Sequence, residues 1–198
     1  MKFARFLLFV LIAISTTAFA QSDAHKDAHK PDTQKPDAPK SEAQQSFDKL
    51  KALAGTWEGK VTGLPEEFTK GKLNEPVQVS LRVTSRGNAL MHEMKGDGPD
   101  DPITMLYLDN DRLLLTHFCD AGNRPRMVGT ISPDGKTVEF EFLDVAGSTQ
   151  YGHMHHALFT FIDADHHTEE WTFILKGDKL MKAHLDLQRA KPQQASAR

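Results

Sequence analysis

Hydrophobic and polar residues alternate along most of the chain with the period of two that is typical of β-strands. The clearest case is Val-Glu-Phe-Glu-Phe at 138–142, where one face is apolar and the other is charged. The pattern predicts strands over residues 57–62, 77–84, 89–95, 103–108, 113–119, 126–131, 138–145, 153–162, 169–175 and 180–188. Residues 45–53 instead carry Phe47, Leu50 and Leu53 at helical spacing, which predicts one short helix before the strands.

The connections between the predicted strands are short and rich in turn-forming residues. Asp-Asn-Asp at 109–111, Ser-Pro-Asp-Gly at 132–135 and Lys-Gly-Asp at 176–178 are typical of tight turns. No connection has the length of a crossover helix, so neighbouring strands should pair antiparallel. Closing the sheet removes its exposed edges, and we therefore predict an all-β, up-and-down antiparallel barrel of about ten strands with a short N-terminal helix. A β-sandwich is the alternative, because a period of two does not separate closure from stacking.

The first part of the chain is predicted to lie outside the barrel. Residues 1–20 combine a basic start, an apolar run and an Ala-Phe-Ala cleavage site, which is the pattern of a secretory signal peptide. Residues 21–45 contain no Leu, Ile, Val, Phe, Trp or Tyr and should form a disordered linker. The barrel domain is expected over residues 46–190, with a disordered tail at 191–198. The protein should be exported, and periplasmic or secreted after cleavage near Ala20.

Composition narrows the class of protein further. A chain of 198 residues suits one domain with terminal extensions. Its 24 Lys and Arg against 27 Asp and Glu give a formal net charge of -3, without the basic footprint of a nucleic-acid-binding protein. The apolar run at 6–14 is shorter than the ~20 residues that cross a bilayer, so the mature protein should have no membrane span. We expect neither nucleic acid nor a transmembrane segment to define its role.

The segment 112–127 concentrates reactive side chains between two apolar runs. His117 and Cys119 are two residues apart on a predicted strand and therefore share a face. If that face is the barrel interior, the imidazole could take the thiol proton, and Arg126 on the next strand could stabilise an anion. An enzyme built on these three residues is one alternative function. Because no third residue that would orient the histidine is visible, we assign no catalytic residue, and core packing of the pair remains the plainer interpretation.

A group of histidines at 153–156 suggests a different chemistry. His153 and His155 share a face on the predicted strand, and such a pair with one further histidine is a spacing that zinc, copper and iron sites use. Two more histidines follow at 166–167, across a predicted turn. The pair is expected to point inward and Met154 outward. A transition metal or haem held by His153 and His155 is therefore a second alternative, although histidines at the start of a strand are often only solvated.

The start of the first predicted strand resembles that of known barrel families. Leu-Ala-Gly-Thr-Trp at 53–57, after a short helix, is similar to the G-x-W start of the calycins, which include lipocalins, fatty-acid-binding proteins and nitrobindin-like barrels. In lipocalins this tryptophan closes one barrel end beneath an arginine from near the end of the barrel sequence. The resemblance implies that structural role for Trp57 and Arg189. Nitrobindin-like barrels hold haem through one histidine, but we match no histidine of this chain to that ligand.

A longer resemblance covers residues 47 to about 172. The matching stretches are residues 47–50, 55–59, 105–107, 113–119 and 122–127, together with Asp109. They are similar to an uncharacterised family of exported bacterial lipocalin-like proteins. The resemblance implies the barrel fold and the exported location, and it supplies no catalytic residue.

The predicted barrel interior is the candidate ligand site, because a barrel of this size can hold one small ligand. The residues expected to line it are Glu93, Met105, Tyr107, His117, Cys119, Arg126, Phe140, Phe142, His155, Phe159 and Trp171. Many apolar and few polar groups suit a small, largely apolar ligand. We therefore interpret the chain as an exported lipocalin-like barrel that binds such a ligand, with the metal or haem site and the enzyme as alternatives.

Overall fold

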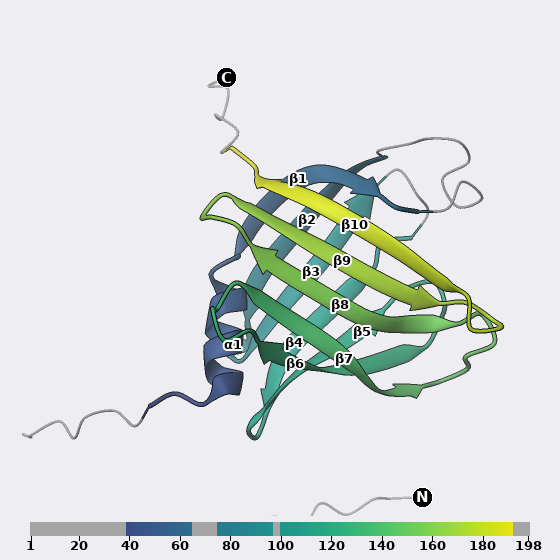
Figure 1. The fold of residues 1–198 in the computed structure, drawn as a ribbon, viewed down its shortest axis with the longest axis horizontal. Helices are drawn as coiled ribbons and strands as arrows, with labels where there is room; N and C mark the ends of the chain where they lie inside the picture. The colour runs from purple at the N-terminus through teal and green to yellow at the C-terminus, as the bar shows by residue number, and fades with distance from the viewer. Residues whose placement is uncertain (1–38, 65–74, 97–99, 192–198) are drawn as a thin grey trace, which may run out of the picture. The chain divides into compact units, whose positions relative to one another are not determined.

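The computed structural model describes residues 39–64, 75–96 and 100–191, and these form one α-helix and ten β-strands (Figure 1). The helix is α1 (Glu42–Lys51), and the strands are β1 (Gly55–Thr62), β2 (Glu75–Thr84), β3 (Ala89–Gly96), β4 (Ile103–Asp109), β5 (Arg112–Phe118), β6 (Arg124–Ile131), β7 (Thr137–Ala146), β8 (His153–Phe161), β9 (His166–Ile174) and β10 (Leu180–Arg189). The predicted signal peptide at 1–20, most of the predicted linker and almost all of the predicted tail lie outside the described residues.

The ten strands form a closed barrel in which each strand pairs antiparallel with its neighbours in the sequence. The last strand, β10, closes on the first, β1, with Trp57 opposite Arg189 in the register. Closure leaves none of the described strands at a free edge. The predicted up-and-down barrel with one short leading helix is therefore confirmed, and the alternative β-sandwich is wrong.

The helix α1 covers one end of the barrel (Figure 1). It begins at Glu42, earlier than predicted, because the Ser41 hydroxyl caps the first turn. This hydroxyl accepts a hydrogen bond from the backbone N–H of Gln44, with an N–O distance of 3.2 Å. Phe47 and Leu50 on its apolar face are buried in the barrel core. In the part of the chain that the structure describes, no helix has the length and hydrophobicity needed to cross a lipid bilayer.

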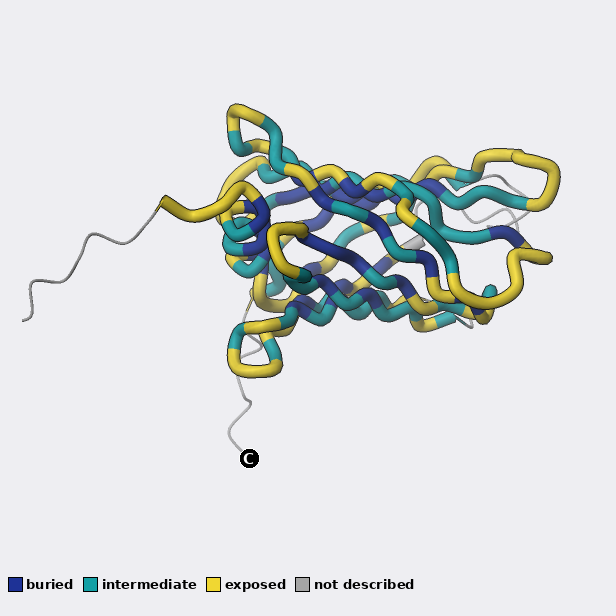
Figure 2. The backbone as a smooth tube through the Cα atoms, turned by 90° about the horizontal axis from the view of Figure 1, so that it is seen from below, coloured by how far each residue is buried: buried dark blue, intermediate teal, exposed yellow. Residues whose placement is uncertain are grey.

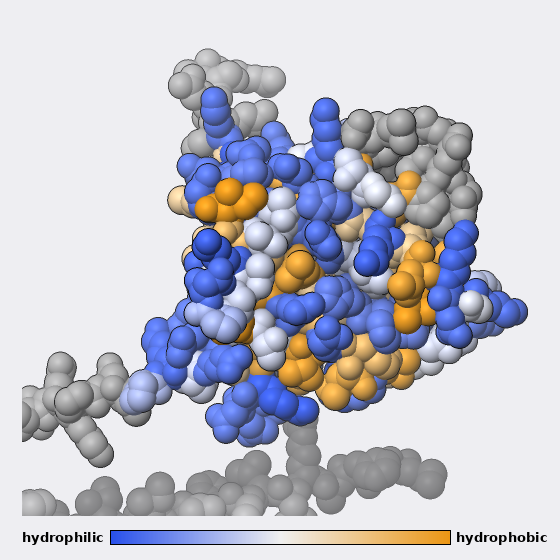
Figure 3. Space-filling model, viewed as in Figure 1, coloured by the Kyte–Doolittle hydropathy of each residue, from blue (hydrophilic) through white to orange (hydrophobic). Residues whose placement is uncertain are grey.

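Side chains alternate between the inside and the outside of the barrel as the sequence pattern predicts. On β7, Val138 and Phe140 are fully buried, whereas Glu139 and Glu141 are exposed. Figure 2 shows this alternation of buried and more exposed residues along the strands. Figure 3 shows mainly hydrophilic residues, with smaller hydrophobic patches, on one outer face. The apolar face of each strand therefore builds a single interior.

Strand β9 begins earlier than predicted, at His166. His167 and Thr168, which precede the predicted strand, pair with β10 on one side and β8 on the other, and this pairing extends β9 toward its N-terminus. As a result, His167 and Glu169 lie on the same inward face as Trp171, and all three are buried. This extension brings two ionisable side chains into the barrel interior.

Candidate functional site

A cavity of about 620 Å³ lies at the end of the barrel away from α1. It is bounded by the ends of β1, β3, β5 and β9 and by the starts of β4, β8 and β10. Most of its wall is apolar and consists of Val61, Leu64, Met94, Pro102, Ala121, Met154, Phe173, Leu175, Met181, Ala183 and Leu185. The remaining lining residues are Asp100, His117, Cys119, Asp120, Tyr151 and Trp171. The cavity is thus a mainly apolar space with a few polar groups.

His117 from β5 and Trp171 from β9 lie deep in this cavity, and we call these two residues the floor. Their ring centroids are 5.6 Å apart, and His117 is only 3% exposed while Trp171 is 4% exposed. Asp120 and Tyr151, in contrast, are exposed to solvent and lie at the mouth. A molecule that entered from the mouth would therefore meet an aromatic and imidazole surface at the bottom.

His117 is an uncharged histidine whose orientation is fixed by Thr104 on β4. Thr104 Oγ1 and His117 Nδ1 are 2.8 Å apart, and both side chains are buried. Burial, and then the charge of His92, lowers the pKa of His117 to about 3. The ring is therefore neutral near pH 7. Within the described residues its second nitrogen, Nε2, has no hydrogen-bond partner.

A buried carboxylate, Glu169, lies behind the floor. It is fully buried and accepts hydrogen bonds from Trp171 Nε1 at 2.9 Å, His92 Nε2 at 2.9 Å and His167 Nε2 at 3.1 Å. Burial alone raises the pKa of Glu169, but the charge of His92 and the hydrogen bonds from His167 and His92 outweigh it, so the pKa lies below its usual range. The ionised carboxylate holds the indole of Trp171 in place.

Trp57 and Arg189 close the opposite end of the barrel. The Arg189 guanidinium lies 4.1 Å from the centroid of the Trp57 ring, within the range of a cation–π interaction. Arg189 also donates to the backbone carbonyls of Ala54 at 3.0 Å and Ala164 at 2.9 Å. Trp57 donates to the carbonyl of Leu53 at 2.8 Å. This is the arrangement that the lipocalin resemblance implies for the two residues.

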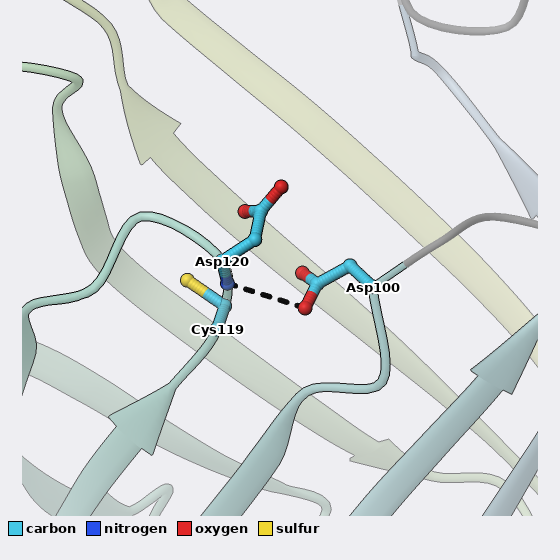
Figure 4. A group of neighbouring side chains, drawn as sticks. All are labelled: Asp100, Cys119 and Asp120. Carbon is cyan, nitrogen blue, oxygen red and sulfur yellow. Dashed lines mark hydrogen bonds between the residues drawn. The ribbon is translucent and has the colours of Figure 1, made fainter.

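Cys119 lies at the cavity mouth beside Asp100 and Asp120, and the backbone N–H of Asp120 donates to Asp100 Oδ1 at 3.2 Å (Figure 4). Burial, and then the negative charges of Asp100 and Asp120, raises the pKa of the Cys119 thiol. The thiol therefore stays protonated near neutral pH. A histidine whose pKa is lowered to about 3 is a weak base for a thiol whose pKa is raised, so these electrostatics do not favour a thiolate at Cys119.

Of the residues predicted to line the interior, His117, Cys119 and Trp171 line the cavity. Phe140 and Phe159 are fully buried, with ring centroids 5.9 Å apart, and Phe159 also packs against Trp171. These two phenylalanines lie outside the cavity lining and fill the barrel core. The interior is therefore part solid and part hollow.

Four predicted lining residues lie on the outer face of the barrel. They are Glu93, Met105, Tyr107 and Arg126, each of which alternates with buried residues on its strand. Arg126 pairs there with Asp144, and its Nε lies 2.8 Å from Asp144 Oδ1. The hydrogen bond between Tyr107 and Thr116 joins two more outward side chains at 3.0 Å. A period of two shows which residues share a face, but it does not show which face is inside.

The expected orientation of the β8 histidines is reversed by a β-bulge. The pairing of β8 with β9 shifts in register from Met154 to His156. This bulge adds one residue to β8, so the inward and outward positions are exchanged on one side of the bulge. Met154 consequently lines the cavity, and His153 and His155 do not. His153 Nε2 and His155 Nδ1 are 3.3 Å apart, and both rings pack against Phe142. His155 and Phe142 are therefore not part of the ligand cavity.

Potential metal ligands gather in two groups of three among the described residues, and neither includes His153 or His155. The groups are Asp100 with Cys119 and Asp120, and Glu139 with Glu141 and His156. Burial, and then the charge of His155, lowers the pKa of His153. A pair of histidines with no third protein ligand falls short of the three or four that zinc sites use.

The sequence analysis missed the buried polar residues behind the floor, His92, His167 and Glu169. The alternation that places Trp171 inside also places Glu169 inside, because the two are separated by one residue. His92 shares its face with Met94 in the same way. The burial of an ionised side chain normally costs too much free energy to be expected from the sequence. The burial of Glu169 is explained by its hydrogen bonds with His92 and His167.

Solved structures share this barrel fold. The crystal structure of Rv2717c from M. tuberculosis is similar, with a TM-score of 0.56 and 17% sequence identity over 74% of this chain and 98% of that chain. A protein of unknown function from the DUF3598 family of Nostoc punctiforme PCC 73102 is similar, with a TM-score of 0.50 and 10% identity. That match covers 71% of this chain and 49% of the other, so this chain spans about half its length. No protein-family model and no curated protein matches this chain.

Proposed function

We propose that the barrel binds one small, largely apolar ligand in the cavity above the His117–Trp171 floor. The observation that carries the proposal is a cavity of about 620 Å³ whose wall is mainly apolar. This volume falls within the range of sites that hold small organic molecules, which also combine apolar walls with a few oriented polar groups. Transfer of an apolar molecule from water to such a wall is favourable in proportion to the area that it buries.

In the part of the chain that the structure describes, the filled half of the barrel supports a fixed site that is reached from the opposite end. The core near α1 is packed with large side chains, including Trp57 and Phe140, both of which are fully buried. Arg189 covers Trp57 at that end. The ligand therefore enters from the mouth beside Asp120 and Tyr151 and stops at the floor. A barrel that is closed at one end and open at the other is a suitable receptor for a compact ligand.

Filling the cavity tests this function. The neutral dye N-phenyl-1-naphthylamine should bind the wild-type protein with a rise in fluorescence, because its emission increases in apolar surroundings. Ala183→Trp places an indole in the cavity wall and should weaken dye binding by about 10-fold or more, since the added side chain occupies the ligand's space. The measurement is a fluorescence titration at pH 7.

The matched control for this titration is Lys182→Trp. Lys182 is the preceding residue on β10 and is exposed on the outer face, so the same indole there should leave the dye affinity within about twofold. If the dye does not bind the wild-type protein, or if both tryptophan variants bind it equally well, the cavity is not a binding site for apolar molecules.

We also propose that the protein is exported and that the barrel is of the lipocalin-like, calycin type. Export is supported by the signal-peptide pattern of residues 1–20. The barrel type is supported by the Gly-Thr-Trp start of β1 and by Arg189 over Trp57.

The export proposal has a direct test. Protein recovered from the periplasm or medium of an exporting bacterial host should begin at Gln21, because the Ala-Phe-Ala sequence precedes it. N-terminal sequencing or intact mass measurement checks this. Ala18→Arg with Ala20→Arg should block cleavage, and cytoplasmic protein that still begins at Met1 in the wild type would contradict export.

A further inference from the structure

One nitrogen of His117 faces the cavity and has no hydrogen-bond partner among the residues that the structure describes. Nδ1 is 2.8 Å from the Thr104 hydroxyl, and within the described residues Nε2 forms no hydrogen bond although the side chain is only 3% exposed. The fully enclosed polar side-chain atoms without a partner among the described residues are Asn123 Oδ1 and His167 Nδ1, so His117 Nε2 is not sealed in the core and is accessible from the cavity. A ligand that supplies the missing partner would bind more tightly than a pure hydrocarbon of the same shape.

The surroundings of His117 determine the charge that such a ligand can carry. Among the described residues the lining includes no lysine or arginine, and its two carboxylates are Asp100 and Asp120 at the mouth. Behind Trp171 lies the ionised Glu169. His117 is itself neutral. An anion in this cavity would lose its hydration and find no opposite charge among the lining residues that the structure describes.

The two possible tautomers of His117 limit which polar groups of a ligand can hydrogen-bond to Nε2. If the Thr104 hydroxyl donates to Nδ1, then Nε2 carries a hydrogen and needs an acceptor. If Nδ1 donates to Thr104, then Nε2 is an acceptor and needs a donor. A hydroxyl group both donates and accepts, so it satisfies either tautomer. A ketone or an ether satisfies only the first.

We propose that the cavity selects an uncharged, apolar alcohol, whose hydroxyl hydrogen-bonds to His117 Nε2 and whose hydrocarbon part packs against the apolar wall. This inference rests on the proposed ligand-binding function and adds the ligand's chemical class. His117 is the specificity-determining residue, and the acidic mouth formed by Asp100 and Asp120 disfavours ligands of the same length that end in a carboxylate.

Competition between two ten-carbon probes tests the selection. 1-Decanol and decanoate should each be titrated against wild-type protein loaded with N-phenyl-1-naphthylamine at pH 8, where the acid is ionised. We expect 1-decanol to displace the dye at a concentration at least about 10-fold lower, since decanoate must be desolvated without a counter-charge. Equal displacement, or tighter binding of decanoate, would overturn the proposal. This comparison requires no variant.

Two sets of variants separate the contributions of His117 and the mouth. His117→Phe keeps an aromatic ring and removes the hydrogen bond to the hydroxyl, so it should weaken 1-decanol binding by about 3- to 10-fold relative to any change in the dye affinity of the same variant. Asp100→Asn with Asp120→Asn should narrow the gap between decanoate and 1-decanol. The control is His184→Phe, a half-buried position on β10 outside the cavity lining, which should change neither affinity.

The outcomes distinguish this inference from the proposed function. If the dye binds and Ala183→Trp weakens it, but His117→Phe leaves 1-decanol binding unchanged relative to the dye, the cavity binds ligands and the assignment of His117 is wrong. If the dye does not bind the wild-type protein at all, the proposed function fails, and the inference fails with it.

Discussion

Replacing Glu169 with alanine is expected to lower the free energy of unfolding by about 3–5 kcal/mol. The carboxylate is fully buried and accepts hydrogen bonds from Trp171, His92 and His167. Its removal leaves these three donors unpaired inside the barrel and leaves any charge on His92 without a partner. Since domains of this size are stable by about 5–15 kcal/mol, the variant should lose a large part of its stability. Guanidinium unfolding at pH 7, followed by Trp fluorescence and circular dichroism, measures the change.

The matched control is Glu170→Ala. Glu170 is the next residue on β9, and its side chain is 52% exposed and 3.6 Å from His184. Substitution at such a surface position should change the free energy of unfolding by less than about 0.5 kcal/mol. A loss of the same size in both variants would show that the buried network is not what stabilises this part of the barrel.

Acidification from pH 7 to pH 4 is expected to destabilise the protein by about 3 kcal/mol through His117 alone. In the unfolded chain this ring takes up a proton as the pH falls below its usual pKa of about 6.5, whereas in the folded protein the pKa is lowered to about 3. Between these two values the unfolded state binds more protons than the folded state, so stability falls as the pH falls. The loss begins near pH 6.5 and is complete near pH 3.

Glu169 acts in the same direction but mainly at lower pH. Its folded pKa is below the ordinary value, so its contribution is present above the unfolded pKa and is lost as the pH falls through the folded pKa. Comparison of wild-type protein with His117→Phe isolates the histidine. The difference in unfolding free energy between pH 7 and pH 4 should shrink by about 3 kcal/mol in that variant. The control, His184→Phe, should retain the pH dependence of the wild type, and an unchanged pH dependence in His117→Phe would refute the assignment.

These two predictions concern His117 in the cavity floor and Glu169, which lies behind the floor and holds Trp171. Glu169 fixes the indole of Trp171, and Thr104 fixes the imidazole of His117, so the two ring surfaces at the bottom of the cavity are each held by a buried hydrogen bond. A binding surface that is rigid before the ligand arrives loses less conformational entropy on binding. The polar network therefore keeps the floor in one conformation, which would favour the proposed ligand binding.

Most of the fold can be predicted from the sequence, because its signals are local. Strand β7 is defined by the alternation of Val138 and Phe140 with Glu139 and Glu141, and short turn sequences define where strands end. A run of about ten strands without a crossover helix leaves antiparallel pairing as the natural topology, and closure follows from the cost of exposed edges. The shared face of His117 and Cys119 follows from the same periodicity.

The candidate site was predicted only in part. His117, Cys119 and Trp171 were placed correctly on the cavity, whereas Arg126 was assigned to the interior and lies outside. Residues two apart on β6 share a face, but the packing of the whole barrel decides which of its two faces is buried. His155 was also wrongly assigned to the interior, but for another reason. The β-bulge that changes the alternation on β8 depends on the pairing of β8 with β9, which the sequence does not show.

What the sequence determined by itself is therefore the number and direction of the strands and the sets of residues that share a face, whereas the closure of the sheet, which it only favoured over a β-sandwich, was decided by the pairing of β1 with β10. The strands and the shared faces follow from the geometry of neighbouring residues. The tertiary structure decided which face is inside, where the barrel is hollow and why Glu169 can be buried. The carboxylate of Glu169 is held by His92, which is 77 residues away along the chain. Such a pairing has no local signal, because the energy that offsets the burial of the charge comes from a partner that only the closed barrel brings into contact.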